Sequence, residues 1–331
     1  MQTNNIQPPP VLALRPATPW TVNRALRSYG VVAVFLGLCV AFSLASEFFM
    51  SWNNWLNILR QSSINAMLAV GVGFVVLTRG IDLSVGSIMA LSGAVAGSLA
   101  TGADPQSMPA FMLAGLAVGA VLGGANGVLV AKVGVPSFVV TLGMMSVARG
   151  LTLIFTDGQP IPNLSASFRW FGAGSIAGVP IPVLILAVVV AAAWIVLKHT
   201  PFGRYVYAVG GNEKAAKTSG VRTDLVKVAT YVISGVLAGL AGIVLAARTS
   251  AALPQAGLGY ELDAIAAVVI GGTSLSGGRG SVVGTLLGAL IIGTINNGLD
   301  LMGVSSYYQQ LFKGLIIIVA VILDFSRDRS S

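Results

Sequence analysis

A few cations and amides inside otherwise apolar stretches have the clearest chemical potential in this chain. Arg149 and Lys313 each lie about seven residues inside an apolar run. A cation in hydrocarbon costs at least ~2.5 kcal/mol on insertion scales, so each should face a polar cavity or a partner, unless it snorkels to the outer interface. The predicted solute route comprises Asn65, Asn126, Arg149, Asn296, Asn297, Gln309 and Lys313. These groups suit a hydroxyl-rich neutral solute, and the amides equally suit hydrogen bonds between helices.

Residues for catalysis or metal binding are scarce. Cys39 is the single cysteine, inside an apolar run, and His199 is the single histidine, beside Lys198 at the end of another. The chain has no Cys/His pair, Ser/His/Asp set or metal-ligand spacing, which argues against most hydrolytic enzymes and predicts no metal site. It also lacks the G-x-x-x-x-G-K-[ST] phosphate loop. If ATP drives this protein, another subunit must bind and hydrolyse the ATP.

The stretch "AVGGNEKAAKTSG" (208–220) is polar in an apolar chain. Asn212 is a good N-cap, Glu213 and Lys217 lie four residues apart, and Gly220 suits the left-handed C-terminal position. The pattern predicts a helix of about two turns. So short a helix is marginal alone in water, so it packs on this protein's own loops or serves as a docking site for a cytoplasmic partner.

The elements that position these residues are membrane helices. The 331 residues are 55% hydrophobic and 9% charged, with mean hydropathy +0.85, whereas soluble domains carry about 25% charged residues. The net charge is +8. Its Lys and Arg residues lie between apolar runs, which indicates that they set the membrane topology rather than bind nucleic acid. Ten spans are predicted: 29–46, 56–78, 82–101, 109–131, 136–156, 180–197, 226–247, 261–276, 281–299 and 306–324. The eighth is short and Gly-rich, so it is a candidate for a broken or re-entrant helix.

Cation positions orient the spans. With the N-terminus inside, the inside segments and their flanking helix ends hold 14 of the 19 Lys and Arg residues, as the positive-inside rule requires. The prediction is a cytoplasmic tail (1–28), a permease domain (29–324) with a cytoplasmic loop (198–225), and a cytoplasmic tail (325–331).

The sequence also repeats itself. "NGVLVAKVGVPSF" (126–138) resembles "NGLDLMGVSSY" (297–307), and "IDLSVGSIMALSGAVAG" (81–97) weakly matches "LDAIAAVVIGGTSLSGG" (262–278). Spans two to five then correspond to spans seven to ten in inverted orientation, which is typical of transporters. Chance similarity between Gly-rich helices is the alternative.

Two further motifs favour structural roles. Glycines recur at four-residue spacing and predict close helix packing: Gly115, Gly119, Gly123 and Gly127, then Gly235 with Gly239, and Gly284 with Gly288. In "TRGIDLSVGS" (78–87), Asp82 can accept from the free N–H groups that begin the next helix. We therefore predict a structural motif of Asp82, Ser84 and Gly86, with a gate or an ion pair of Arg79 with Asp82 as the alternative.

Four stretches carry a family resemblance: "GIDLSVGS", "FGRYVYAVGGNEKAAKTSG", "GYELDAIAAVVIGGTSLSGGRG" and "NNGLDLMGVSSYYQ". Over about residues 30–325 the chain resembles the permease subunits of bacterial ribose ABC transporters, which belong to the monosaccharide-uptake permeases. The Pro-rich start "QPPPVLALRP" lies outside the resemblance.

The resemblance implies an all-α integral membrane protein of the type II ABC importer kind, in the bacterial inner membrane with both termini cytoplasmic. It implies pairing with a second permease copy or a homologue, a cytoplasmic ATPase that binds ATP and Mg, and a periplasmic sugar-binding protein. The ATPase-coupling residues would be Asn212, Glu213, Lys214, Ala215, Ala216, Lys217, Thr218, Ser219 and Gly220. No cofactor is expected on this chain.

Two other function classes compete with a sugar permease. A membrane-embedded enzyme lacks a catalytic constellation. A self-sufficient secondary transporter or channel would usually need an intramembrane carboxylate, whereas the candidate acids lie near predicted span ends: Asp82, Glu261, Asp263 and Asp300.

Overall fold

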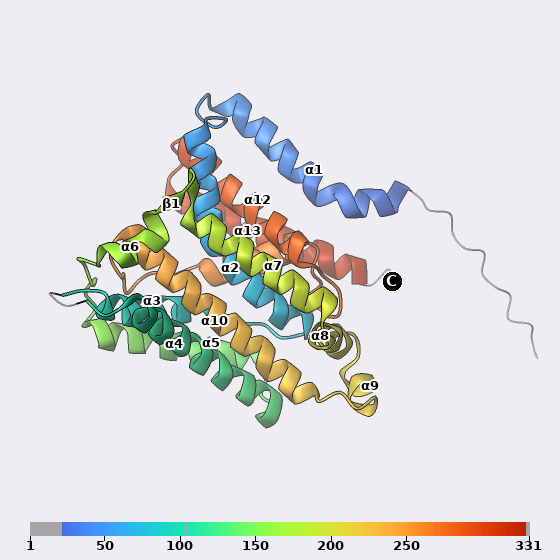
Figure 1. Ribbon diagram of the computed structural model, residues 1–331. Helices are drawn as coiled ribbons and strands as arrows, with labels where there is room; N and C mark the ends of the chain where they lie inside the picture. The colour runs from blue at the N-terminus through green and yellow to red at the C-terminus, as the bar shows by residue number, and fades with distance from the viewer. Residues whose placement is uncertain (1–21, 103–104, 329–331) are drawn as a thin grey trace, which may run out of the picture.

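The computed structural model describes residues 22–102 and 105–328, and these residues are almost wholly helical (Figure 1). Helices occupy all ten ranges predicted to span the membrane. They are α1 (Val22–Ala45), α2 (Trp52–Leu77), α3 (Val85–Leu99), α4 (Met108–Val128), α5 (Ser137–Thr156), α7 (Ile181–His199), α10 (Thr223–Thr249), α11 (Tyr260–Ile270), α12 (Val282–Leu301) and α13 (Ser306–Asp328). Shorter elements connect them: the π-helix η1 (Leu129–Val133), α6 (Ala166–Ala173), the antiparallel pair β1 (Ser175–Ile176) and β2 (Val179–Pro180), α8 (Pro201–Gly211) and α9 (Glu213–Thr218).

Helix length separates the spans into two kinds. Six helices among the described residues are long and apolar enough to cross a membrane: α2, α4 with η1, α5, α7, α10 and α12. By contrast α11 has 11 residues, about 16 Å at 1.5 Å per residue, and cannot cross about 30 Å of hydrocarbon. The predicted short eighth span is therefore confirmed. The third predicted span, 82–101, is also shorter than expected, because α3 has 15 residues.

Both terminal helices extend past the predicted span limits. Helix α1 begins at Val22, inside the predicted tail 1–28, and α13 continues to Asp328, inside the predicted tail 325–331. A helix need not end where its apolar run ends, because Arg, Leu and Ala are all good helix formers. Residues 1–21 and 329–331 of the predicted tails lie outside the described residues.

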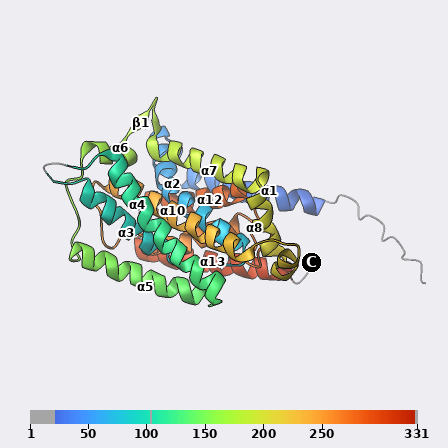
Figure 2. The ribbon, with the colours of Figure 1, turned by 60° about the horizontal axis from the view of Figure 1, so that its bottom comes forward.

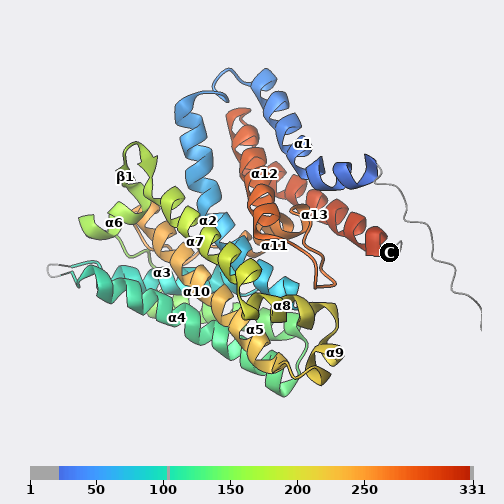
Figure 3. The same ribbon diagram turned by 45° about the vertical axis from the view of Figure 1, so that its right-hand side comes forward.

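The packing of the helices follows the predicted repeat. Helix α2 packs on α11 and α12, and its counterpart α10 packs on α3 and α4. Likewise α3 packs on α4 and α5, as α11 packs on α12 and α13, while α2 and α10 pack on each other. Exchanging the two sets of four helices therefore maps each of these contacts onto another. Figure 3 shows α2 and α10 running through the middle of the bundle.

Glycines allow the closest of these approaches. A Cβ on Gly119 of α4 would overlap the carbonyl oxygen of Gly235 of α10, and the reverse also holds. Gly127 faces Val228 and Gly115 faces Gly239, so the two helices run antiparallel. The prediction of tight packing from the glycine spacing is confirmed.

The connecting segments gather at two ends as the cation count predicted. At one end, Ile81 N–H donates to Ser137 Oγ at 3.1 Å and Gly278 N–H to Leu77 O at 3.0 Å. The start of α1 and the end of α13 lie toward the same side of the bundle as α8 (Figure 2). At the other end, Ser165 N–H donates to Ala100 O at 2.7 Å, and Ile161 forms a β-bridge with Ala252.

Candidate coupling surface and solute route

Helix α9 has the boundaries that its sequence predicted. Asn212 is the N-cap, and its Oδ1 accepts the Ala215 N–H at 3.0 Å. At the C-terminus Gly220 has φ +86°, and Val221 N–H donates to Ala216 O at 3.0 Å. Gly220 N–H also donates to Lys217 O at 3.1 Å, and these two hydrogen bonds around a left-handed glycine form the Schellman motif. Local capping therefore fixes this helix of six residues.

The charges of α9 pair differently from the prediction. Glu213 forms an ion pair with Lys227 of α10 at 2.6 Å, and no ion pair of Glu213 with Lys217 occurs among the described residues. An i,i+4 pair on an exposed helix is worth only a few tenths of a kcal/mol. Lys227, with 18% of its side chain exposed, offers a better shielded partner. The result ties α9 to α10 and leaves Lys214 and Lys217 exposed.

Helix α8, which sequence reasoning missed, supports α9. Thr200 caps it by accepting the Gly203 N–H at 3.2 Å, and Pro201 occupies its first position. Thr-Pro is a helix-start signal that could have revealed it. Its buried Val206 and Val209 join a cluster with Leu197 of α7. Tyr207 donates to Gly280 O at 3.0 Å, and burial raises the pKa of its phenol.

Arg79 joins this surface to the end of α2. Its guanidinium donates to Gly210 O at 2.6 Å and to Gly211 O at 2.8 Å. Its backbone has φ +65°, a conformation that costs most residues strain. An open hollow beside it is lined by Arg79, Gly211, Asn212, Glu213, Lys214 and Lys217. Within the described chain Arg79 forms no ion pair with Asp82, so the ion-pair alternative for this motif is wrong.

Asp82 instead holds a buried polar network. Its Oδ1 accepts the Ser84 N–H at 3.0 Å and the Ser84 hydroxyl at 2.6 Å, at the N-cap of α3. Its Oδ2 accepts the hydroxyl of Ser234 on α10 at 2.8 Å. Asn126 of α4 donates to Ser84 Oγ at 2.9 Å. Asp82 therefore accepts the backbone N–H of the N-cap residue Ser84, and it also links α3 to α10.

The two predicted intramembrane cations lie beside acids of α11. Lys313 of α13 pairs with Asp263 at 2.9 Å. Arg149 of α5 donates to Pro254 O and lies within electrostatic reach of Glu261. Glu261 and Asp263 are polar groups that sequence reasoning left outside the solute route. Their position in the first turn of a short, Gly-bounded helix was the available signal.

The predicted amides differ in whether their side-chain oxygens have hydrogen-bond partners. Asn297 exchanges two hydrogen bonds of 2.9 Å with Asn54, and Gln309 donates to Asp300 at 2.6 Å. These serve helix packing, the alternative left open for them. Asn65, Asn126 and Asn296 are buried, and the side-chain oxygen of each has no hydrogen-bond partner among the described residues. Among the described residues, no side-chain hydrogen bond or ion pair joins any two of the seven predicted route residues.

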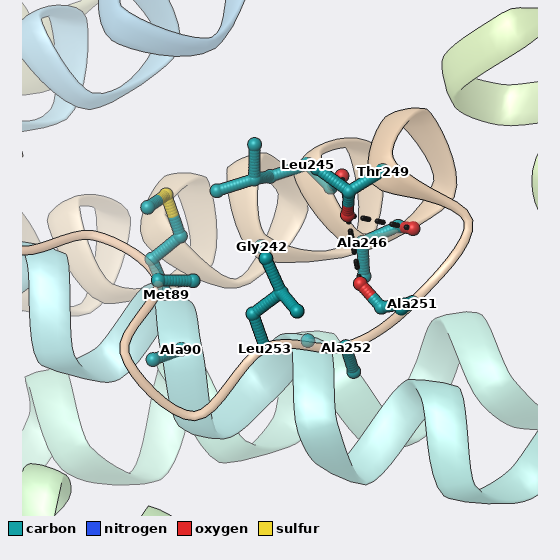
Figure 4. A pocket seen from close by; sticks show the side chains of 11 residues that line it. Met89, Ala90, Gly242, Leu245, Ala246, Thr249, Ala251, Ala252 and Leu253 are labelled. Atoms are coloured by element: carbon teal, nitrogen blue, oxygen red, sulfur yellow. Dashed lines mark hydrogen bonds between the residues drawn. The ribbon is translucent and has the colours of Figure 1, made fainter. Parts of the chain in front are cut away.

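A crevice between α3 and the end of α10 has a different character (Figure 4). Its lining is apolar except for Thr249, whose hydroxyl donates to Ala251 O at 2.7 Å. It offers a polar solute almost nothing to bind. Among the described residues no group of three or more His, Cys, Asp or Glu side chains could hold a metal ion.

Comparisons with known proteins agree with this architecture. Residues 54–321 match the family described as "Branched-chain amino acid transport system / permease component". The chain is 50% identical over 298 residues to a ribose import permease protein of Escherichia coli (strain K12), covering 89% of this chain and 92% of the relative. It is 51% identical over 296 residues to one of Bacillus subtilis (strain 168), covering 88% and 91%. A D-allose transport system permease protein of E. coli (strain K12) is 43% identical over 298 residues, covering 89% and 91%. No solved structure matches the chain.

Proposed function

From the premise that the chain belongs to the family of branched-chain amino acid transport system permease components, we propose that its own substrate is ribose or a closely related monosaccharide. The chain is the membrane-spanning permease subunit of an ABC importer, a multi-pass protein of the inner membrane and not an enzyme. Its partners are an ATPase and a substrate-binding protein. The choice of sugar rests on the identity of about half of the aligned residues with ribose import permeases of Escherichia coli and Bacillus subtilis.

The finer assignments belong to this proposal. Helix α9, capped at both ends and tied to α10, docks in the ATPase, which binds ATP with Mg. Two copies of the chain pair in the membrane, and both termini lie in the cytoplasm. Support for the docking role comes from the exposed Lys214 and Lys217 beside a hollow whose wall includes Arg79. A protruding, prestructured helix loses little conformational entropy when it docks.

A secondary transporter is the competing function. Asp82 and Asp263 lie near helix starts yet are buried in the bundle, so their positions do not count against a secondary transporter. The matched family and the ribose import permeases among the relatives favour an ABC permease instead.

Charge reversal on α9 tests coupling. In proteoliposomes containing the permease, the ATPase and the binding protein, Lys214→Glu with Lys217→Glu should lower ATP-driven ribose uptake at least about tenfold, by losing more than about 1.4 kcal/mol of docking energy. Lys132→Glu, an exposed lysine of η1, is the matched control and should transport normally.

Two outcomes would contradict the proposal. Normal uptake and ATPase binding by the Lys214/Lys217 double variant would exclude α9 as the docking element. Uptake by the wild-type permease alone, driven by an ion gradient without the ATPase, would favour the secondary transporter.

A further inference from the structure

Two short helices start deep in the bundle. Ala252 lies beside Gly97 near one end of α3, and Gly257 lies against Gly86 in its first turn. The segment 252–257 therefore runs along α3 for about 16 Å, eleven residues of helix, before α11 begins. A Cβ on Gly86 would overlap Gly257 O and Oε2 of Glu261. The first turns of α3 and α11, equivalent in the two repeats, thus meet inside the molecule.

Four charged side chains lie at the start of α11, and we name them the charged junction: Arg149, Glu261, Asp263 and Lys313. They come from α5, α11 and α13. Arg248 of α10 lies within electrostatic reach of Tyr260, the first residue of α11, and is not part of this set. Asp263 has 8% and Lys313 28% of its side chain exposed. Nε of Arg149 is buried and has no hydrogen-bond partner among the described residues. Glu261 Oε1 accepts the nearby Gly259 N–H at 3.2 Å.

The junction lies between two apolar faces. Leu142, Val147 and Leu151 of α5 are exposed, as are Leu311, Phe312 and Leu315 of α13. Apolar faces suit lipid or another protein, but each charge at membrane depth costs at least about 2.5 kcal/mol on insertion scales. The partly buried charges therefore face a water-filled or protein-lined space rather than lipid.

The charge balance of the junction selects a kind of solute. Two carboxylates accept hydrogen bonds and two cations donate them, so the net charge is zero. Adjacent sugar hydroxyls, each both donor and acceptor, match such an alternating set. A phosphorylated or carboxylated solute would bring a charge that the junction does not neutralise. The chemistry therefore favours a neutral polyhydroxylated solute.

We propose that the charged junction is a transient binding station for the sugar on its way through the permease. Glu261 and Asp263 accept from sugar hydroxyls, and Arg149 and Lys313 donate to sugar oxygens. This inference rests on the proposed import of a monosaccharide. A structural tie between α11 and α13 through Asp263 and Lys313 is the rival role.

Transport by junction variants separates these roles. In proteoliposomes with the ATPase and saturating binding protein, Glu261→Gln should lower the maximal ribose uptake rate about tenfold to a hundredfold, as expected for one charge-assisted hydrogen bond. Exchanging Asp263→Lys with Lys313→Asp restores an ion pair but not the site, so its uptake should stay low. Ser146→Ala, one turn from Arg149 and exposed, is the control. Wild-type uptake by the exchange variant would establish the structural tie and overturn the station.

A labelling measurement guards against misfolding of those variants. The chain has one cysteine, so Cys39→Ser gives a cysteine-free background for Lys313→Cys. A charged thiol reagent should modify this cysteine in the assembled complex, and ribose with binding protein and ATP should slow the reaction. L-glucose should not slow it. Leu311→Cys, on an exposed apolar position of α13, should show no protection.

The two proposals fail separately. Absence of ATP-driven ribose uptake by the wild-type complex would refute the proposed substrate. Normal wild-type uptake, with Glu261→Gln as active as wild type or with no protection at Lys313→Cys, would refute only the station.

Discussion

Asp82 is a buried carboxylate that forms no ion pair within the described part of the chain. The side chain is fully buried, and its hydrogen-bond donors are the N–H and hydroxyl of Ser84 and the hydroxyl of Ser234. Charge-assisted hydrogen bonds to a carboxylate are about twice as strong as neutral ones. They compensate for the water that the group loses on burial.

Replacing this carboxylate should destabilise the bundle. Asp82→Asn puts an amide N–H₂ where an acceptor stood, so one donor in the network loses its partner, at about 1–3 kcal/mol. Thermal unfolding in detergent measures the loss. Asp157→Asn is the control, because this acid is exposed and asparagine tolerates its left-handed backbone. Equal melting temperatures for the two variants would show that the network adds no stability.

Residue roles that depend on near neighbours were predictable, and those that depend on distant ones were not. Asn212 and Gly220 bond within five positions along the chain, so their types and spacing fixed the limits of α9. The partner of Asp82 on α10 lies 152 positions away. Glu213 likewise pairs with Lys227 rather than with the neighbour that periodicity favoured.

At the scale of elements, replacement by alanine should change the stability of the protein in opposite directions at Gly119 and at Gly143. Alanine within a helix normally adds about 0.5–1 kcal/mol over glycine. At Gly143 of α5 a Cβ meets nothing within 4 Å, so Gly143→Ala should stabilise the protein slightly. At Gly119 the Cβ overlaps Gly235 O, so α4 and α10 must separate and Gly119→Ala should cost about 1–3 kcal/mol. Melting temperatures that rise for both variants would contradict the close crossing.

Apolar runs predicted where helices occur but not how far each crosses the membrane. The ten expected ranges all contain helices. The length of α3 was overestimated because its apolar run includes Asp82 and Ser84, which lie before the helix and form hydrogen bonds with each other. Helix α8 was not predicted, because it lies in a polar segment between two apolar runs.

At the scale of the whole molecule, the inverted repeat places the two short helices in opposing orientations around one centre. The packing of α2 with α11 and α12 corresponds to that of α10 with α3 and α4. Internal similarity in two short motifs was enough to predict this correspondence. The close contact of Gly86 with Gly257 could not be predicted from the sequence, because it depends on how a segment without regular periodicity folds back into the bundle.

The side of the membrane on which the two termini lie can be tested in cells. Because 14 of 19 Lys and Arg residues fall in the inside segments and helix ends, we expect both termini in the cytoplasm. A C-terminal green fluorescent protein fusion should be fluorescent, and a C-terminal alkaline phosphatase fusion should be inactive. A phosphatase fusion after Gly102, at the opposite end, is the control and should be active. An active C-terminal phosphatase would reverse the orientation.

The close crossing of α4 and α10 at their glycines also imposes a delay during synthesis of the chain. Gly119 and Gly235 are 116 positions apart, so at 5–20 residues per second the ribosome needs about 6–23 seconds to make the second partner after the first. During that interval the glycine face of α4 lies in the membrane without α10, the helix on which it packs. A nascent permease therefore has to be shielded from the α10 of a neighbouring, newly finished copy, which makes its assembly sensitive to synthesis rate and crowding in the membrane.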